Sequence, residues 1–461
     1  MCVRAATGFN LPEPSEPAII GPLTLLLDGG PPPAFPLAAL LHHLVALRED
    51  ELCMFTIVAL SQLAQTLRYR EAALRQGLVS PVVALIVQRP AVAMLRAAVC
   101  LLLVLTDGEP PAPFAEFEAS LPALASLLLS QDEPTVLTTC HILASLSAGS
   151  PSEVERVATS GVCRPLVELL SHQSVPVRVH ALRTVANIAS GDWTCVALLL
   201  ACSVVPALRP SLYHASPELN FEACWALSNI LGSHHSAGAS SGRCARPALP
   251  RSSSELRLLA TVASKERILP RLLGLCDHTD ARVRTNAVWA MLNLITQLSS
   301  VPSAAFDMRP LGFVRPICGA FTSADAAMVY GALRALDALL ASAYLHSREG
   351  CAMPACPTCP GYSYSLVICR REFCSVVEAV FECSGVADLE SLQHHPNASI
   401  HKAALSVLAT YFDLEPDAFS PHGAGSESES LSSPVEMQSS PPDESDAALL
   451  RHSDYIDVPA L

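Results

Sequence analysis

EACWALSN (residues 222–229) and NAVWAMLN (residues 286–293) share one pattern, a tryptophan followed four residues later by an asparagine. The two pairs are Trp225 with Asn229 and Trp289 with Asn293. Both stretches are strongly helical in composition, and a spacing of four residues places two side chains on one helix face, one turn apart. The pattern therefore predicts two helices that each present an indole and an amide side by side.

The distance between such pairs indicates a structural repeat. HALRTVANIASGD (residues 180–192) has Arg183 and Asn187 at the same offset, and Arg183 precedes the first tryptophan by 42 residues. The two tryptophans are 64 residues apart, and a Ser/Gly-rich stretch between them accounts for the longer step. Helical segments that recur about every 42 residues are typical of armadillo and HEAT solenoids.

Aligning the helical units extends the pattern along the chain. One equivalent position, here called the ladder position, holds Ile57, Cys100, His141, Arg183, Trp225, Trp289 and Arg334. The position four residues later holds Ser61, Val104, Ser145, Asn187, Asn229, Asn293 and Ala338. We therefore predict an all-α fold, a right-handed superhelical solenoid of about eight armadillo repeats.

The domain organisation follows from where this helical pattern begins and ends. Residues 1–36 are rich in Pro and Gly and are expected to be irregular, and residues 37–413 are expected to form the solenoid. Insertions are predicted near 232–254 and 345–365. Residues 414–461 are predicted to be a disordered tail, because they are rich in Ser, Pro and acidic residues.

Glycine and proline mark the ends of the predicted helices. QGLVSP (residues 76–81) and SGVCRP (residues 160–165) have a glycine shortly before a proline, which fits the first turn of a helix. AGSP (residues 148–151) and SGDW (residues 190–193) follow the third helix of a unit. Their glycines are expected to be left-handed helix stops.

Composition excludes some classes of function. The 461 residues are 51% hydrophobic but only 5% aromatic, which suits many small helix–helix contacts. The net charge of −14 disfavours nucleic acid and favours cationic partners. The longest apolar runs, such as residues 97–105, are too short to span a membrane. Residues 1–41 lack the pattern of a signal peptide.

The cysteines suggest neither disulfides nor a strong metal site. The chain has 17, an odd number, and several lie in apolar helical segments, as Cys100 and Cys140 do, so we expect reduced, buried thiols in an intracellular protein. Zinc ligation is conceivable in the loop that holds Cys351, Cys356, Cys359, Cys369 and Cys374. The spacing lacks paired C-x2-C knuckles, so a loop of exposed cysteines is the favoured interpretation. No phosphate loop or catalytic constellation is found, and we expect neither an enzyme nor a cofactor.

These stretches resemble the importin alpha family, the adaptors that bind nuclear localisation signals. VRVHALRTVANIASGD resembles that family's sixth repeat, while FEACWALSNI and TNAVWAMLNL resemble its seventh and eighth. CSGVADLESLQHHPNASIHKAALSVLATYF is similar to its last repeat. The resemblance implies a groove for basic peptides, nuclear protein import as the function, and a location in both cytoplasm and nucleus.

The departures from the family concern two features. The family's major signal-binding site is eroded, because its positions hold Ile57 with Ser61 and Cys100 with Val104, and Gln65 aligns with its acid. The basic arm that binds importin beta is not recognisable in residues 1–50, so we expect no direct importin beta binding. The last repeat keeps the family pattern, which implies docking of the exporter of importin alpha with Ran-GTP.

The minor signal-binding site is retained. The candidate peptide-binding residues are Arg183, Asn187, Ser190, Asp192, Glu222, Trp225, Asn229, Trp289 and Asn293. An asparagine amide has a donor and an acceptor, so a row of them can hold the backbone of an extended peptide. Indole rings can line slots for the stems of Lys and Arg, with Glu222 and Asp192 as acids for the charged heads.

Two alternatives to this interpretation remain. A single tryptophan on a helix is more often a core residue than a ligand contact, although two Trp/Asn pairs in one register favour binding. A different class of function is a non-transporting armadillo scaffold or regulator that binds other proteins. Loss of the arm and of the major site favours the scaffold, whereas the retained minor site favours cargo binding.

Overall fold

The computed structural model describes residues 41, 50–108, 110–232, 268–299, 311–348 and 376–412. These residues fall into two compact units, residues 1–233 (unit 1) and residues 234–461 (unit 2), which are described separately below. Every regular element in the described ranges is a helix. The predicted N-terminal segment, the acidic tail, the cysteine-rich loop and nearly all of the first insertion lie outside these ranges.

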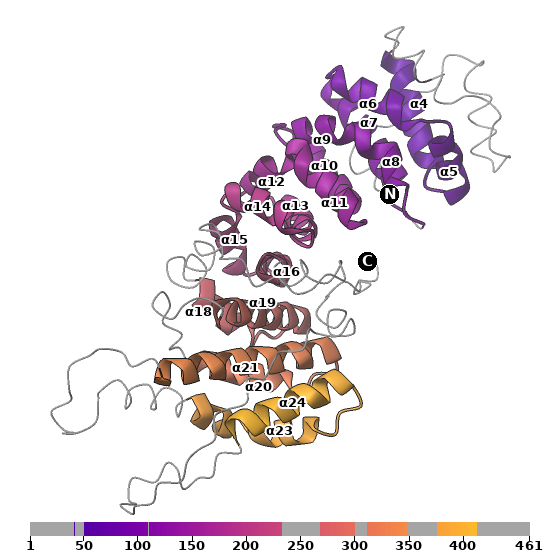
Figure 1. The fold of residues 1–461 in the computed structure, drawn as a ribbon. Helices are drawn as coiled ribbons and strands as arrows, with labels where there is room; N and C mark the ends of the chain where they lie inside the picture. Colours follow the sequence, from indigo (N-terminus) through magenta and orange to yellow (C-terminus); the bar gives the residue numbers. More distant parts are fainter. Residues whose placement is uncertain are drawn as a thin grey trace, which may run out of the picture. The chain divides into compact units, whose positions relative to one another are not determined.

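Unit 1 is a series of helical repeats in which the third helices pack against each other in chain order. The first described third helix is α4 (Asp50–Leu63). The next repeat consists of α5 (Leu67–Arg75), α6 (Val79–Val87) and α7 (Val92–Thr106), and the one after it of α8 (Phe114–Phe117), η1 (Glu118–Ser120), α9 (Leu121–Leu127) and α10 (Glu133–Leu146). A further repeat consists of α11 (Pro151–Val157), η2 (Ala158–Val162), α12 (Cys163–Leu169) and α13 (Val175–Ala189). The last described repeat of unit 1 consists of α14 (Trp193–Ala201), α15 (Val204–Leu212) and α16 (Pro217–Gly232). Contacts join α4 to α7, α7 to α10, α10 to α13 and α13 to α16 (Figure 1).

Unit 2 has the same construction within its described ranges. Its helices are α18 (Ile268–Leu275), α19 (Ala281–Ser299), η6 (Leu311–Phe313), α20 (Val314–Ala320), α21 (Ala326–Arg348), a helix over residues 376–382, α23 (Gly385–Leu392) and α24 (Ala398–Tyr411). Here α19 packs on α21, and α21 packs on α24. The second insertion was predicted to begin at residue 345, but residues 345–348 still belong to α21.

The core consists of small aliphatic side chains between successive repeats. In α13 nearly every residue from Val177 to Ala189 is buried, because a third helix has neighbours on both sides. Alanine and leucine serve this position, since they are good helix formers and fit between closely spaced helices. The cysteines Cys100, Cys140 and Cys224 in these helices are likewise buried, and none of the three forms a disulfide.

In four described repeats the turn between the first and second helix contains a left-handed residue. Gly77 has φ 70° and Gly161 has φ 93°, and both precede the prolines that mark the second helix. Ser203 and Ser384 take the same conformation, with φ 61° and 60°. The non-glycine residues accept a backbone strain that glycine avoids.

The glycines after the third helices have a different role from the one predicted. Gly149 and Gly191 are not left-handed, so the prediction of left-handed helix stops is wrong for them. A Cβ atom at Gly191 would lie 2.9 Å from the Cys195 sulfur and 3.1 Å from Val154 Cγ1. At Gly149 it would overlap the Glu153 carboxylate. These glycines allow the next helix to start close by, rather than supplying an unusual φ.

A histidine turn recurs between the second and third helices. The ring nitrogen Nδ1 of His172 accepts a hydrogen bond from the backbone N–H of Ser174, at 3.1 Å. His214 does the same for Ser216, His278 for Asp280 and His395 for Asn397. Each histidine thus stabilises the entry to a third helix, and its Nδ1 must be unprotonated to do so.

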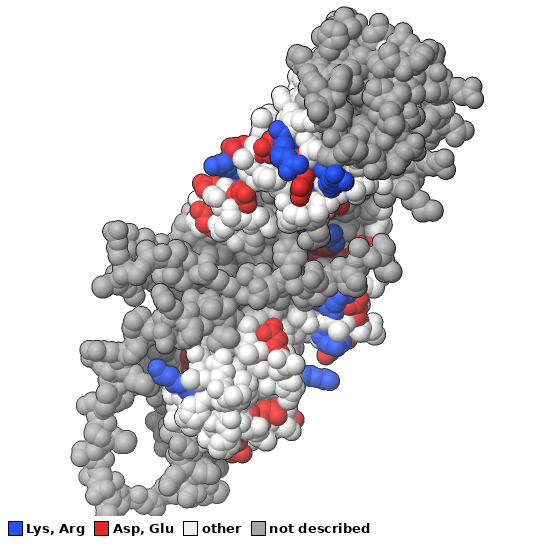
Figure 2. Space-filling view, turned by 90° about the vertical axis from the view of Figure 1, so that its right-hand side faces the viewer, with Lys and Arg blue, Asp and Glu red and all other residues white. Residues whose placement is uncertain are grey.

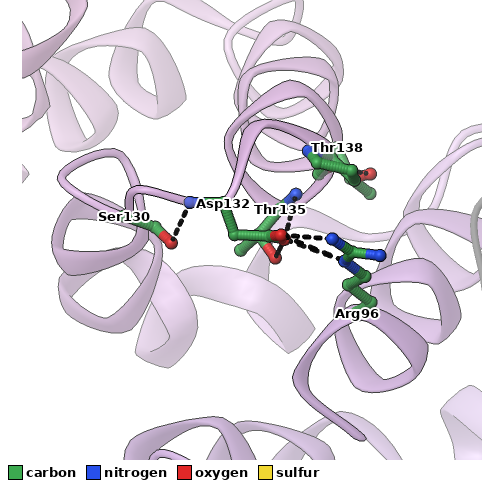
Figure 3. Close-up of polar contacts among 6 residues, drawn as sticks. Arg96, Ser130, Asp132, Thr135 and Thr138 are labelled. Atoms are coloured by element: carbon green, nitrogen blue, oxygen red, sulfur yellow. Dashed lines mark hydrogen bonds and ion pairs between the residues drawn. The ribbon is translucent and has the colours of Figure 1, made fainter. Parts of the chain in front are cut away.

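Asp132 joins two third helices at the start of α10. Its carboxylate caps the helix by accepting from the Thr135 N–H at 3.1 Å, and both of its oxygens also accept hydrogen bonds from Nε and Nη2 of Arg96 in α7 (Figure 3). The Arg96 guanidinium, foremost, and the Thr135 hydrogen bonds hold the pKa of Asp132 down at about 2. The carboxylate is therefore ionised wherever the protein is folded near neutral pH.

The described helices include no single one that is long and apolar enough to cross a membrane. Among these helices, α14 and α15 reach the length and apolar composition of a membrane span only when they are taken together, and they are bent by 79° relative to each other.

Candidate functional site

The predicted site residues are carried by third helices of both units. Unit 1 holds Arg183 and Asn187 in α13, Ser190 and Asp192 just after it, and Glu222, Trp225 and Asn229 in α16. Unit 2 holds Trp289 and Asn293 in α19. The residues that the structure brings together are those of unit 1, because α13 and α16 pack side by side.

The asparagines of unit 1 tie each repeat to the one before it. Asn187 donates from Nδ2 to the Ala144 carbonyl oxygen at 2.9 Å and to the Ser147 hydroxyl at 3.1 Å. Asn229 donates from Nδ2 to the Ala186 carbonyl oxygen at 2.9 Å. The amides therefore have a structural partner that the sequence pattern does not reveal. One N–H and the side-chain oxygen of Asn229 make no further hydrogen bond to the described residues.

Arg183 and Glu222 form an ion pair across the two helices. The guanidinium donates to Glu222 Oε1 from Nε at 2.9 Å and from Nη2 at 2.5 Å. The Glu222 side chain is fully buried, whereas that of Arg183 is 40% exposed. Glu222 was expected to meet a basic group of the peptide, but in this structure Arg183 covers and neutralises it.

One repeat earlier, two histidines make the equivalent contact between the third helices α10 and α13. His141 of α10 stacks on His180 of α13 with 4.5 Å between the ring centroids and 26° between the planes. Burial is the main cause that lowers the pKa of His180 to about 4, with His141 and Arg183 adding to it. Burial also lowers the pKa of His141, and Arg183 does so too, against the opposing effect of Asp107. Both rings are therefore neutral at pH 7.

Trp225 and Asn229 are half-buried on one face of α16, as the spacing predicts. The Trp225 indole lies 6.5 Å from the Phe221 ring, centroid to centroid, at an angle of 30°. A half-buried indole keeps part of its surface for a ligand while the rest packs on the helix.

Ser190 and Asp192 are exposed at the junction of α13 and α14. The Ser190 hydroxyl donates to the Asn187 carbonyl oxygen at 2.7 Å. The Asp192 carboxylate accepts from the Cys195 N–H at 3.1 Å and so caps α14. A cap uses one oxygen, which leaves Asp192 a solvent-facing acid near the ladder positions of unit 1.

Trp289 in unit 2 is in a different environment from Trp225. It is only 3% exposed. Its ring lies so close to Gly331 of α21 that a Cβ atom there would be 3.0 Å from Trp289 Cζ3. Asn293, one turn later, is half-buried. In this structure the Trp289 ring packs between helices instead of forming an open wall.

The remaining features do not compete with this site. Ile57 and Cys100, at the ladder positions of α4 and α7, are buried. The described ranges contain no group of three or more His, Cys, Asp or Glu side chains that could hold a metal. A cleft of about 580 Å³ in unit 2 is lined by residues of α18, α20 and 376–382, away from the ladder helices. Charges of both signs are interspersed on the face shown in Figure 2.

Comparison with known proteins defines the class of this chain. The armadillo/beta-catenin-like repeat model matches residues 150–190, 195–232 and 262–296, and the atypical Arm repeat model matches residues 374–424. A designed armadillo repeat protein in complex with the peptide (KR)4 superposes with a TM-score of 0.46 and 21% identity, over 57% of this chain and all of its own. The chain is an all-α armadillo-repeat protein, which confirms the predicted fold class.

The curated relatives are importin alpha subunits. Importin subunit alpha-1a of Oryza sativa subsp. japonica is 36% identical over 162 residues, which is 35% of this chain and 31% of the relative. Importin subunit alpha-B of Dictyostelium discoideum is 42% identical over 110 residues, covering 23% and 21%. Importin subunit alpha-8 of Arabidopsis thaliana is 29% identical over 191 residues, covering 41% and 43%. The chain is therefore similar to importin alpha subunits over part of its length, and it spans about a third of the length of the first of these relatives.

Proposed function

We propose that this chain binds extended basic peptides of the nuclear localisation type along the ladder positions of α13 and α16 in unit 1. The observation that carries the proposal is the pair in α16. Trp225 and Asn229 are both half-buried, one turn apart, on a helix that packs against another with an asparagine in the same register. Repeated amides can follow a peptide backbone, and a partly exposed indole can hold an aliphatic stem.

The charges of unit 1 support a cationic ligand. Asp192 is exposed at the start of α14, five residues after Asn187 in the chain, and the whole chain carries a net charge of −14. Arg183 and Glu222 neutralise each other, so they do not cancel the effect of Asp192. We infer that the basic side chains of a bound peptide lie nearer to Trp225 and Asp192 than to Arg183.

The cellular role follows from the relatives and extends the proposal. It is the delivery of basic cargo proteins into the nucleus, with the chain present in cytoplasm and nucleus. Export would use the importin alpha exporter with Ran-GTP, docked on the repeat over residues 376–412. The expectation that importin beta does not bind directly stays a prediction, because residues 1–40 lie outside the described ranges.

A second function is favoured by two observations. Trp289 packs against Gly331, and Glu222 is paired with Arg183, so three of the nine predicted site residues already have intramolecular partners, as Asn187 and Asn229 also do. An armadillo scaffold that binds another protein without carrying cargo fits these contacts. The two functions differ in whether a short basic peptide binds at all.

Binding of a fluorescent peptide with a short Lys/Arg core, measured by anisotropy on the full chain, tests the proposal. Trp225→Ala should weaken binding by about 2 kcal/mol if the indole is a hot spot. Asn229→Ala should cost about 1–2 kcal/mol, although part of this reflects the lost bond to Ala186. Affinity should also fall with added salt.

Tyr213→Ala is the matched control for Trp225→Ala. Tyr213 is an exposed aromatic residue of the same repeat, just after α15 and away from the ladder position. It should leave binding unchanged. If Trp225→Ala binds the basic peptide as well as the parent does, cargo recognition here is wrong, and the scaffold becomes the better explanation.

A further inference from the structure

The stacked histidines occupy the ladder one repeat before Arg183. His141 holds the ladder position of α10, and His180 lies three residues before the ladder position of α13. Arg183 and Glu222 occupy the same two positions one repeat later, so the two contacts use equivalent positions with different chemistry. His141 is not a tryptophan, so the Trp/Asn pattern by itself does not predict a binding slot at this position.

His141 nevertheless presents an aromatic surface. Its side chain is 35% exposed, so one face of the ring packs on His180 while part of it remains open to solvent. A neutral imidazole that is fixed by stacking offers a planar surface to a flat cationic group.

A carboxylate lies beside the His141 ring. The Asp107 carboxylate lies 3.7 Å from His141 Nε2, and its side chain is 56% exposed. Asp107 is the residue at which α7 ends, so the backbone of the preceding repeat positions it. A cation that rests on the His141 ring would therefore have a carboxylate at its edge.

Arg183 is a cation close enough to lower the pKa of His141. Its guanidinium donates two hydrogen bonds to Glu222, so much of its charge is offset by that carboxylate. Asp107 is the exposed acid beside His141, and it is the carboxylate that a cationic ligand on this ring would meet.

We propose that His141, supported by His180, and Asp107 form an additional subsite that takes an arginine side chain of the bound peptide. This inference rests on the proposed binding of basic peptides and extends it by one repeat. Arginine fits better than lysine, because a planar guanidinium can stack on the ring and bond a carboxylate with two N–H groups at once. Lysine has only a compact ammonium, which gains less from a flat surface.

Two kinds of peptide test the subsite on the full chain. The first has a Lys/Arg core flanked by alanine, and the second has one added arginine, moved through successive positions on either side of the core. One register should bind about fivefold to tenfold more tightly than the core alone. Lysine in that register should give a smaller gain.

Four variants separate the subsite from general electrostatics. Asp107→Asn and His141→Ala should each abolish the gain from the added arginine while leaving the affinity of the core peptide unchanged. His141→Phe keeps an aromatic surface and should retain most of the gain. Glu168→Gln removes an exposed acid of α12, away from the ladder, and should change neither affinity.

Each outcome discriminates between the proposals. A gain that survives both Asp107→Asn and His141→Ala overturns the subsite, even if the core peptide binds through Trp225. If the core peptide fails to bind but the arginine peptide binds in an Asp107-dependent way, the subsite stands and the proposed function fails. If neither peptide binds, both are wrong.

Discussion

Arg183 in α13 donates two hydrogen bonds to one carboxylate oxygen of Glu222 in α16, and the carboxylate is fully buried. The two residues are 39 positions apart, so the pair joins one armadillo repeat to the next. A residue that belongs to a peptide-binding pattern thus also holds the solenoid together. Substitutions at either position will affect stability before they report on binding.

Arg183→Met should destabilise the joint between α13 and α16. It removes the positive partner of a buried carboxylate, and such a loss costs about 3 kcal/mol or more. Hydrogen exchange followed by mass spectrometry should show the opening free energy of α13 and α16 falling by that amount. The double variant Arg183→Met with Glu222→Leu should recover most of it, because the unpaired charge is gone. Equal stability of parent and single variant would show that the pair contributes nothing.

Unit 1 should lose stability as the pH falls from about 6.5 to about 4. Burial holds the pKa of His180 at about 4, below its usual 6.5, so in this range the unfolded chain binds a proton that the folded chain excludes. The effect amounts to at most about 3 kcal/mol and is absent above this range. Denaturant unfolding at several pH values measures it.

His180→Phe is the variant that isolates this dependence. It keeps a ring against His141 and removes the titrating group, so stability should become flatter between pH 4 and 6.5. His401→Gln, on α24 of unit 2, is the control and should keep the slope of unit 1. If His180→Phe leaves the change of stability with pH unaltered, then other groups cause the pH dependence.

Much of the helical register could be predicted from the sequence. The i, i+4 spacing of Trp225 and Asn229 correctly placed them on one face of a third helix, and the step of about 42 residues correctly located α10, α13 and α16. Both inferences depend only on local periodicity, which the chain itself carries.

The partners of these side chains could not be predicted in the same way. Whether Trp289 is open or buried depends on Gly331 in the next repeat, and Asn187 reaches a carbonyl of the preceding one. Such contacts depend on side-chain volumes between repeats, not on spacing within one. The histidine turns are an exception. A His followed two residues later by Ser, Asp or Asn, as in His172 with Ser174, recurs before four third helices and is visible in the sequence.

Asp132→Ala should weaken unit 1 at neutral pH. It removes the cap of α10, which typically contributes about 1 kcal/mol, and it also leaves Arg96 without its carboxylate. The pKa of Asp132 is lowered to about 2, so its contribution is complete above about pH 4 and is lost as the pH falls through about 2. Asp325→Ala, at the start of α21, is a comparison without an arginine partner in the described contacts and should show a smaller loss. Equal losses in both variants would contradict a role for Arg96.

Trp289 should behave as a core residue of unit 2 when it is substituted. Trp289→Ala removes a ring that is 3% exposed, and a buried tryptophan typically costs about 3–5 kcal/mol. Gly331→Ala tests the same contact from the other side, because its Cβ would lie 3.0 Å from Trp289 Cζ3. Overpacking costs about 1–3 kcal/mol, which exceeds the gain of about 1 kcal/mol in helix propensity, so the net effect should be destabilising.

Gly319→Ala separates these two effects. Gly319 lies in α20 and a Cβ atom there meets nothing within 4 Å, so alanine should raise stability by up to about 1 kcal/mol. Thermal or denaturant unfolding of the three variants gives the comparison. If Gly331→Ala stabilises as much as Gly319→Ala does, the Trp289 ring can move aside, and an open indole at this ladder position becomes possible. If it destabilises, a loss of peptide binding in Trp289→Ala reflects damage to unit 2, and only Trp289→Phe, which preserves most of the buried ring, can report on recognition.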